Sequence, residues 1–177
     1  MSSRDDEYTE YISARMMSLR RTAYLLCQDW HRADDLVQAA ITKLYVHWGR
    51  ARAADHIDAY ARTVLVREFL GERRSAWARR VSLHGQLTRA STGETSDHDA
   101  LLDLRAALAA VPPRQRATLV LRFYCDLNVE QAAQVLGCSA GTVKSQTVKG
   151  LAALRRALDP DPDPGPQSAG ERRTRHG

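Results

Sequence analysis

Apolar residues recur at steps of three and four along two long stretches of the chain, and this period predicts amphipathic α-helices. The first stretch holds three such segments, with a break at Gln28–Trp30 and another that begins at Gly49. Because neighbouring amphipathic helices bury their apolar faces against one another, we expect one helical domain over residues 5–80. Its predicted helices are 7–26, 32–47 and 57–74.

The second stretch has the same period, with capping and turn residues between its segments. Pro112 and Pro113 end one helix and start the next, because proline fits the first turn of a helix but not its interior. Asn128 and Gln131 have the spacing of a capping box. We expect a second helical domain over residues 99–158, with predicted helices at 101–111, 114–124, 129–137 and 140–158.

The segments outside these stretches have a different composition. Residues 81–98 lose the apolar period and gain Ser, Thr, Gly and acidic residues, which indicates a linker. Residues 159–177 hold four of the six prolines and predict a disordered, Pro-rich tail. Only 6% of the residues are aromatic, which favours helices over strands. The sequence therefore predicts an all-α protein of two small helical domains joined by a flexible linker.

Charge follows the same division. Residues 1–80 carry 14 Lys and Arg against 11 Asp and Glu, and residues 101–158 carry 8 against 3, whereas residues 81–100 carry 1 against 3. Two basic blocks around an acidic connector indicate surfaces that face a polyanion. No run of about 18 apolar residues occurs and the N-terminus is polar, so we expect a cytoplasmic protein without membrane insertion.

Residues for catalysis or metal binding are sparse. Cys27, Cys125 and Cys138 are an odd number at unrelated spacings, which indicates reduced thiols in helices. Cys27 and His31 stand four residues apart and could share a helix face as metal ligands, but no second pair completes a site. No glycine-rich phosphate loop or nucleophile elbow is present. We therefore expect no metal, no cofactor, no catalytic residue and no enzymatic activity.

The last two predicted helices have the spacing of a helix-turn-helix. Gly137 permits the sharp turn between them. Ala132 and Ala133 allow the helices to approach closely, and Leu136 and Val143 fill the small core. An ordinary helical hairpin with a solvated polar face is the alternative interpretation. We favour the helix-turn-helix because a turn glycine, paired alanines and a polar first turn occur together.

The polar start of the second of these helices is then expected to enter the major groove of DNA. Small residues there permit close approach, hydroxyl groups bond phosphate and lysines neutralise it, while Gln146 is placed to read a base edge. The predicted DNA-binding residues are Ala140, Gly141, Thr142, Lys144, Ser145, Gln146 and Lys149.

These motifs resemble a known family. Residues 108–158, with the segments VPPRQR and GTVKSQT, resemble the promoter-reading C-terminal domain of bacterial RNA polymerase sigma factors of the extracytoplasmic-function group (group IV), in its SigE-like branch. The stretch LRRTAYLLCQDWHRADDLVQAAITKLYVHW is similar to the core-binding part of the first sigma domain. IDAYARTVLVREFLGERRSAW is similar to the helix that recognises the -10 element. The resemblance covers residues 8–158.

The resemblance implies a promoter-specificity subunit that binds core RNA polymerase and recognises promoter DNA. The second domain is expected to read the -35 element and the first to recognise and melt the -10 element. Many family members are held inactive by an anti-sigma protein, which is therefore a further candidate partner. The alternative is a free-standing helix-turn-helix activator, which leaves the segment DDLVQ and the arginine-rich third helix unexplained.

By the same resemblance, one acidic segment docks on the largest subunit of core polymerase. An acidic helix edge suits a basic partner surface, with Leu36 and Val37 as apolar anchors. Without the resemblance, the two acids are a solvated helix face or a charge pair near a helix N-terminus. The implied core-binding residues are Asp34, Asp35, Leu36, Val37 and Gln38.

The third predicted helix and the loop before it are implied to contact the -10 element. Arginines in these segments can bind the phosphates of DNA, and the aromatic residues between them could stack on unpaired bases. The alternative for Tyr60 and Phe69 is that both simply belong to the hydrophobic core. The implied -10 DNA-binding residues are Arg50, Arg52, Tyr60, Arg62, Arg67, Arg73 and Arg74.

Overall fold

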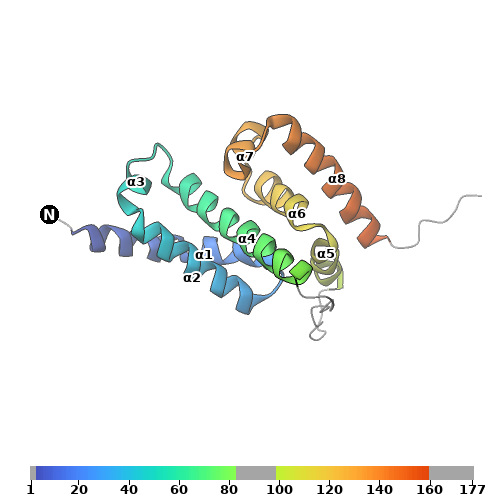
Figure 1. The fold of residues 1–177 in the computed structure, drawn as a ribbon, viewed down its shortest axis with the longest axis horizontal. Helices are drawn as coiled ribbons and strands as arrows, with labels where there is room; N and C mark the ends of the chain where they lie inside the picture. Colours follow the sequence, from blue (N-terminus) through green and yellow to red (C-terminus); the bar gives the residue numbers. More distant parts are fainter. Residues whose placement is uncertain (1–2, 83–98, 160–177) are drawn as a thin grey trace, which may run out of the picture.

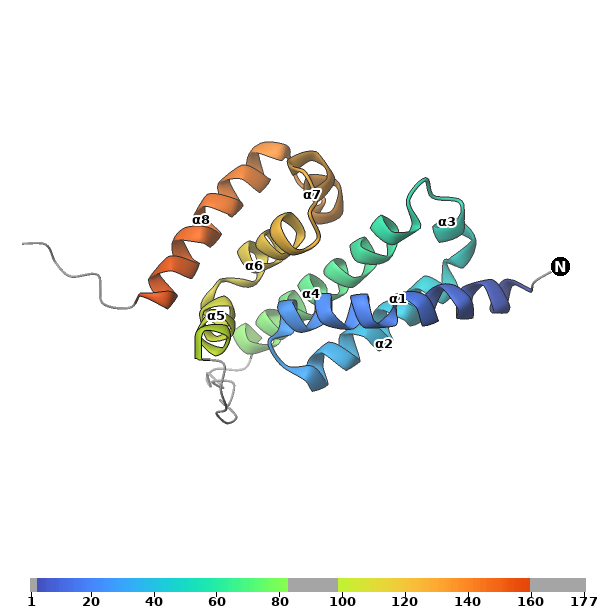
Figure 2. The same cartoon turned by 180° about the vertical axis from the view of Figure 1, so that it is seen from behind.

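The computed structural model describes residues 3–82 and 99–159, with side chains described for 3–72 and 103–159. Over these ranges the chain forms α-helices and one π-helical turn without any strand, which confirms the predicted all-α class. The helices form an N-terminal module, α1–α4, and a C-terminal module, α5–α8, which lie side by side (Figures 1 and 2).

Three longer helices and one short helix build the N-terminal module. Ser3 and Asp6 form a capping box at the start of the module's first helix. Gln28 ends that helix in the left-handed region at φ 58°, and the Asp29 side chain accepts a hydrogen bond from the Arg32 N–H to start the next. These caps explain the predicted break. The helices are α1 (Arg4–Cys27), α2 (Trp30–Val46), α3 (Trp48–Arg52) and α4 (Ile57–Ser82).

Two details of this module differ from the sequence prediction. The segment expected only to interrupt the chain contains α3, held by the side chain of Trp48, which is 3% exposed. α4 runs past the predicted helix end at residue 74 and continues to Ser82, two residues into the segment expected to be a linker. The rest of the linker, 83–98, lies outside the described residues.

The C-terminal module begins with α5 (Asp99–Ala110) and α6 (Pro113–Leu119), with Pro113 in the first turn as expected. The predicted helix 114–124 changes after Leu119 into the π-helical turn η1 (Val120–Tyr124), where the Cys125 N–H bonds Val120 O. The module ends with α7 (Val129–Leu136) and α8 (Ala140–Leu158). Asp159 caps α8, and the remainder of the predicted tail lies outside the described residues.

The two modules share one continuous hydrophobic core. In the N-terminal module, α1, α2 and α4 enclose Leu26, Leu36 and Phe69, each completely buried. The same core continues through Leu121 into Val143 of α8. α4 lies against α7 and α6, so the helix expected to recognise the -10 element touches the module expected to read the -35 element (Figure 1).

Candidate nucleic-acid and polymerase interfaces

The helix-turn-helix predicted from the sequence is present as α7, a tight turn and α8. Asn128 and Gln131 form a reciprocal capping box that starts α7. Gly137 follows α7 at φ 63°, a conformation that glycine adopts at low cost. The Ser139 hydroxyl then accepts a hydrogen bond from the Thr142 N–H and starts α8. These local interactions fix where each helix ends and therefore the angle between them.

Small and apolar residues hold the two helices together as expected. Ala132 and Val143 are completely buried, and Ala133 and Leu136 are each 8% exposed. Gly150 was not identified from the sequence, although it also shapes the motif. A Cβ atom added at Gly150 would lie 3.1 Å from Leu119 Cγ, so glycine allows α8 to approach α6 closely.

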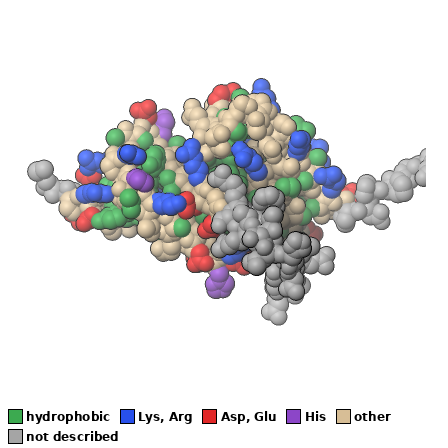
Figure 3. All heavy atoms as spheres, viewed as in Figure 1, with side chains coloured by type: hydrophobic (Ala, Val, Ile, Leu, Met, Phe, Trp, Pro, Cys, Tyr) green, Lys and Arg blue, Asp and Glu red, His purple; other side chains and the backbone are tan. Residues whose placement is uncertain are grey.

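The predicted DNA-reading residues share one helix, and most of them reach solvent. Lys144, Ser145 and Lys149 are exposed on α8, and Gln146 is half-buried. Thr142 is half-buried, and its hydroxyl lies 2.9 Å from the Ser139 hydroxyl, so part of its bonding capacity serves the cap. On the face shown in Figure 3, Lys and Arg side chains lie over both modules, and some of them are on the α8 side of the molecule. The first turns of α8 therefore present donors and positive charge to solvent.

The residues implied in polymerase docking divide into exposed and buried positions. Asp35 and Gln38 are exposed on α2, and Asp34 is half-buried beside them. Leu36 is completely buried and Val37 is 3% exposed, so the expected role of these two residues as surface anchors is corrected. They face α1 and α4 because the apolar stripe of α2 packs into the bundle. Leu36 and Val37 position the acidic edge of α2.

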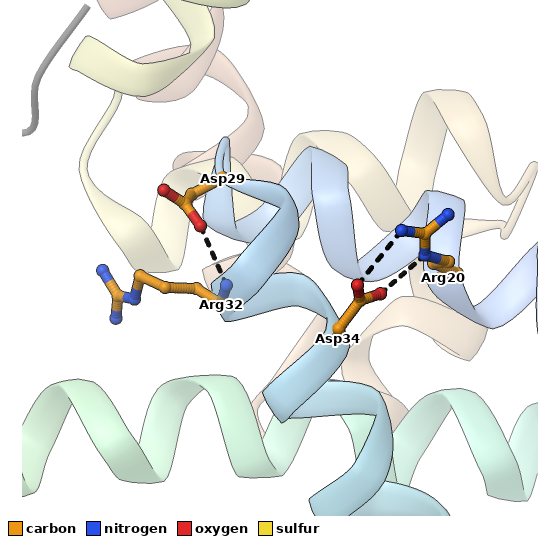
Figure 4. A network of polar contacts seen from close by, with 4 residues as sticks. All are labelled: Arg20, Asp29, Arg32 and Asp34. Atoms are coloured by element: carbon orange, nitrogen blue, oxygen red, sulfur yellow. Dashed lines mark hydrogen bonds and ion pairs between the residues drawn. The ribbon is translucent and has the colours of Figure 1, made fainter.

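Asp34 is held by an arginine from the neighbouring helix (Figure 4). Arg20 Nε lies 2.6 Å from Asp34 Oδ1, and Arg20 Nη2 lies 3.0 Å from Asp34 Oδ2. This two-bond geometry is typical of strong Arg–carboxylate pairs. Hydrogen bonds from Arg20 lower the pKa of Asp34, which keeps its carboxylate charged. The edge therefore presents one carboxylate already paired with Arg20 and a second, on Asp35, that is exposed.

The residues implied in -10 recognition spread over α3 and one side of α4. Arg50 and Arg67 are exposed, whereas Arg52 forms an ion pair with Glu7 of α1. Arg62 is half-buried, with an Nε atom that lacks a hydrogen-bond partner among the described residues. Arg73 and Arg74 lie on α4, but their side chains are outside the described ones.

The two aromatic residues with an open assignment differ in burial. Phe69 is completely buried, so its side chain belongs to the core and not to a base-stacking surface. Tyr60 is half-buried and packs against the same core. The core interpretation therefore holds for Phe69, whereas Tyr60 keeps a partly accessible ring.

The described residues contain no group of three or more His, Cys, Asp or Glu side chains that could hold a metal ion. Cys27 ends α1 and His31 lies in α2, so the predicted break separates them into different helices. Among the helices of 3–82 and 99–159, none is long and apolar enough to cross a membrane.

Comparison with known proteins found a matching family model for each of the two modules. Residues 13–79 match the family model for sigma-70 region 2, and residues 107–156 match the model for sigma-70 region 4. The chain is 35% identical over 161 residues to the RNA polymerase sigma-E factor of Streptomyces avermitilis, covering 86% of each chain. It is 30% identical over 156 residues to the ECF RNA polymerase sigma factor EcfG of Rhodopseudomonas palustris, again covering 86% of each.

The fold also matches solved structures. The sigma factor RpoE of Bartonella quintana, solved with the anti-sigma factor NepR, superposes with a TM-score of 0.68 at 22% identity. That match covers 86% of this chain and 96% of the other. Together with the sequence matches, the helix-turn-helix and the acidic edge of α2 lead to one family. This chain belongs to the RNA polymerase sigma factors, within their extracytoplasmic-function group and its sigma-E-like branch.

Proposed function

We propose that this sigma factor divides its work between its two modules. As a member of the family it binds core RNA polymerase and directs promoter-specific initiation of transcription. The C-terminal module reads the -35 element with the exposed face of α8. The N-terminal module binds polymerase with the acidic edge of α2 and contacts the -10 element with α3 and α4. The chain performs no bond chemistry itself and works in the cytoplasm, where core polymerase and promoter DNA meet.

The helix-turn-helix carries this proposal. Its caps, its turn glycine and its buried alanines hold α8 rigidly, while Lys144, Ser145 and Lys149 stay exposed. Lysines and a hydroxyl on one helix face suit phosphate contacts along a major groove. The half-buried Gln146 is placed in the second turn, where base edges are read.

The acidic edge of α2 supports the polymerase contact. Asp35 and Gln38 are exposed one turn apart, and Asp34 is oriented by Arg20. A basic surface on the partner would meet a carboxylate that is already ionised and fixed in place. The anti-sigma factor in the solved relative makes a protein inhibitor a further proposed partner for this chain.

Charge reversal at the acidic edge tests the polymerase contact. We expect Asp35→Lys to weaken association with core polymerase at least about tenfold, because like charges then face each other across the interface. Glu10→Lys is the matched control, since Glu10 is an exposed acid on α1 of the same module. Both variants are compared by co-elution with core polymerase and by helical circular dichroism. Equal binding by wild type and Asp35→Lys would overturn this docking surface.

A further inference from the structure

A short loop, residues 53–56, joins α3 to α4 at the end of the N-terminal module opposite α5 (Figures 1 and 2). The hydrogen bonds that tie the loop to α3 are long. The N–H groups of Ala53 and Ala54 lie 3.3 Å from Gly49 O and Ala51 O, whereas such distances are typically about 2.7–3.2 Å. The shape of this loop therefore depends on contacts from outside it.

α1 supplies those contacts at both ends of the loop. Just before the loop, Arg52 of α3 forms an ion pair with Glu7. Just after it, Asp58 in the first turn of α4 accepts a hydrogen bond from the Tyr11 hydroxyl at 2.9 Å and another from Arg15 Nε at 3.0 Å. Glu7, Tyr11 and Arg15 follow one another at steps of four residues, so they lie on one face of α1. We call these three residues the clamp.

Aromatic packing holds α3 against the same part of α1. The centre of the Tyr11 ring lies 5.5 Å from the centre of the Trp48 ring, and the Tyr8 ring meets Trp48 edge to face at 5.3 Å. Trp48 is 3% exposed, so a shift of α3 along α1 would uncover an aromatic side chain. The Tyr8 hydroxyl donates to Ile41 O at 2.7 Å. Tyr8 therefore fastens α1 to α2, whereas Tyr11 fastens it to the far end of the loop.

The hydrogen bond between Tyr11 and Asp58 has a fixed direction. Burial, and after it the hydrogen bond to Asp58, raise the pKa of Tyr11, so the hydroxyl keeps its proton and donates it to the carboxylate. The charges of Arg15 and Arg62 reach the same hydroxyl. Arg62 follows Asp58 by one turn of α4 and is one of the residues implied in -10 recognition. The clamp thus lies next to a proposed DNA contact.

The loop and α3 present polar side chains to solvent. Asp55 and His56 are exposed in the loop, and Arg50 is exposed on α3. A carboxylate and an imidazole can bond the edges of bases, whereas a guanidinium suits phosphate. A loop that is free to change shape loses that freedom when it binds, and the loss lowers affinity. Fixing both ends of the loop in advance reduces this loss.

We propose that Glu7, Tyr11 and Arg15 are positioning residues for -10 recognition, which hold the α3–α4 loop in the shape that reads the element. The inference rests on the proposed contact of α3 and α4 with the -10 element. The clamp acts through the two ends of the loop and not by touching DNA. It also gives Arg52 a structural task, because a guanidinium paired with the Glu7 carboxylate is less available to phosphate.

Hydrogen exchange in the free chain tests whether the clamp holds the loop. Tyr11→Phe keeps the aromatic ring and removes only the hydrogen bond to Asp58. Tyr8→Phe is the matched control, because it removes a hydroxyl of the same helix whose bond goes to α2. We expect Tyr11→Phe to speed exchange around the loop about two- to tenfold, the factor for one hydrogen bond, and Tyr8→Phe to leave it unchanged. Exchange is followed by NMR at three hydrogen-bonded N–H groups, those of Ala53, Ala54 and Tyr60.

Promoter discrimination tests whether the clamp serves -10 recognition. Holoenzyme is assembled with each variant. Transcript is then compared between a promoter that the wild-type holoenzyme uses and versions with single base pairs changed in either element. We expect Tyr11→Phe to lower discrimination at the -10 element about two- to tenfold and to leave discrimination at the -35 element unchanged.

A second pair of variants tests the other end of the loop. Glu7→Gln breaks the ion pair with Arg52, whose side chain is 61% exposed, so we expect a smaller loss of -10 discrimination, about twofold. Glu10→Gln is the matched control, because Glu10 is an exposed acid on another face of α1. It should keep the wild-type discrimination at both elements.

A role in stability alone predicts a different outcome. It would lower transcript from every promoter version by the same factor, along with the urea midpoint of unfolding, and Tyr11→Phe would resemble Tyr8→Phe. Unchanged -10 discrimination in Tyr11→Phe, or an equal loss in both tyrosine variants, overturns the positioning role. If the wild-type holoenzyme itself does not discriminate at the -10 element, the proposed function fails. Unchanged exchange in the free Tyr11→Phe chain overturns the clamp without involving polymerase or DNA.

Discussion

Gln146 and Lys144 lie in the same turns of α8 but are expected to make different contributions to DNA binding. Lys144 is exposed and carries a charge, so its interaction with phosphate is independent of base sequence. Gln146 is half-buried and has an amide that can donate and accept toward one base pair. One residue therefore adds affinity, and the other adds specificity.

Alanine substitutions separate these two contributions. Lys144→Ala should weaken binding to every promoter and reduce the slope of log affinity against log salt by about 1. Gln146→Ala should leave that slope unchanged and relax discrimination at one base pair of the -35 element by about 1–3 kcal/mol. Both effects are measured by titrating holoenzyme onto promoter variants at several salt concentrations. If neither substitution changes promoter use, α8 is not the recognition helix.

Helices that begin or end at capping and turn residues were predictable from the sequence. α8 has the predicted bounds because Ser139 caps its start and its apolar period ends at Leu158. The capping box of α7 and Gly137 were likewise visible as residue spacings. η1 and α3 were not, because a π-helical turn has no residue pattern of its own and α3 depends on the burial of Trp48 by distant residues.

The packing of α8 on α6 can be tested by replacing glycine with alanine at two sites. We expect this change to lower the stability of the fold at one site and to raise it at the other. Gly150→Ala would place its Cβ 3.1 to 3.3 Å from three atoms of Leu119. Overpacking lowers the free energy of unfolding by about 1–3 kcal/mol, and the higher helix propensity of alanine raises it by about 1 kcal/mol, so we expect a net loss of up to about 2 kcal/mol. At Gly71 in α4, an added Cβ meets no atom within 4 Å, so Gly71→Ala should raise the free energy of unfolding by about 0.5–1 kcal/mol. The urea midpoint of unfolding is measured for both variants. Equal shifts of the midpoint in the two variants would contradict the close approach of α8 to α6.

At the scale of the whole molecule, the sequence predicted two modules but not their contact. Charge and apolar period are properties of single segments, so they place the acidic edge on α2 and the basic face on α8. The contact depends on residues far apart in the chain, such as Arg116 and Leu26, and on Tyr24 between Trp30 and Arg105. Leu36 and Val37 were misassigned for a related reason, since a helix pattern does not say which neighbour covers an apolar side chain.

Transcription from purified components tests the central claim most directly. Core polymerase without any sigma factor is mixed with this chain and genomic DNA fragments, and the 5′ ends of the transcripts are mapped. We expect discrete start sites that appear only when chain and core are both present, with common elements about 10 and 35 base pairs upstream. Core that stays silent with this chain, while polymerase already carrying another sigma factor is stimulated, would show a free-standing activator and contradict the account.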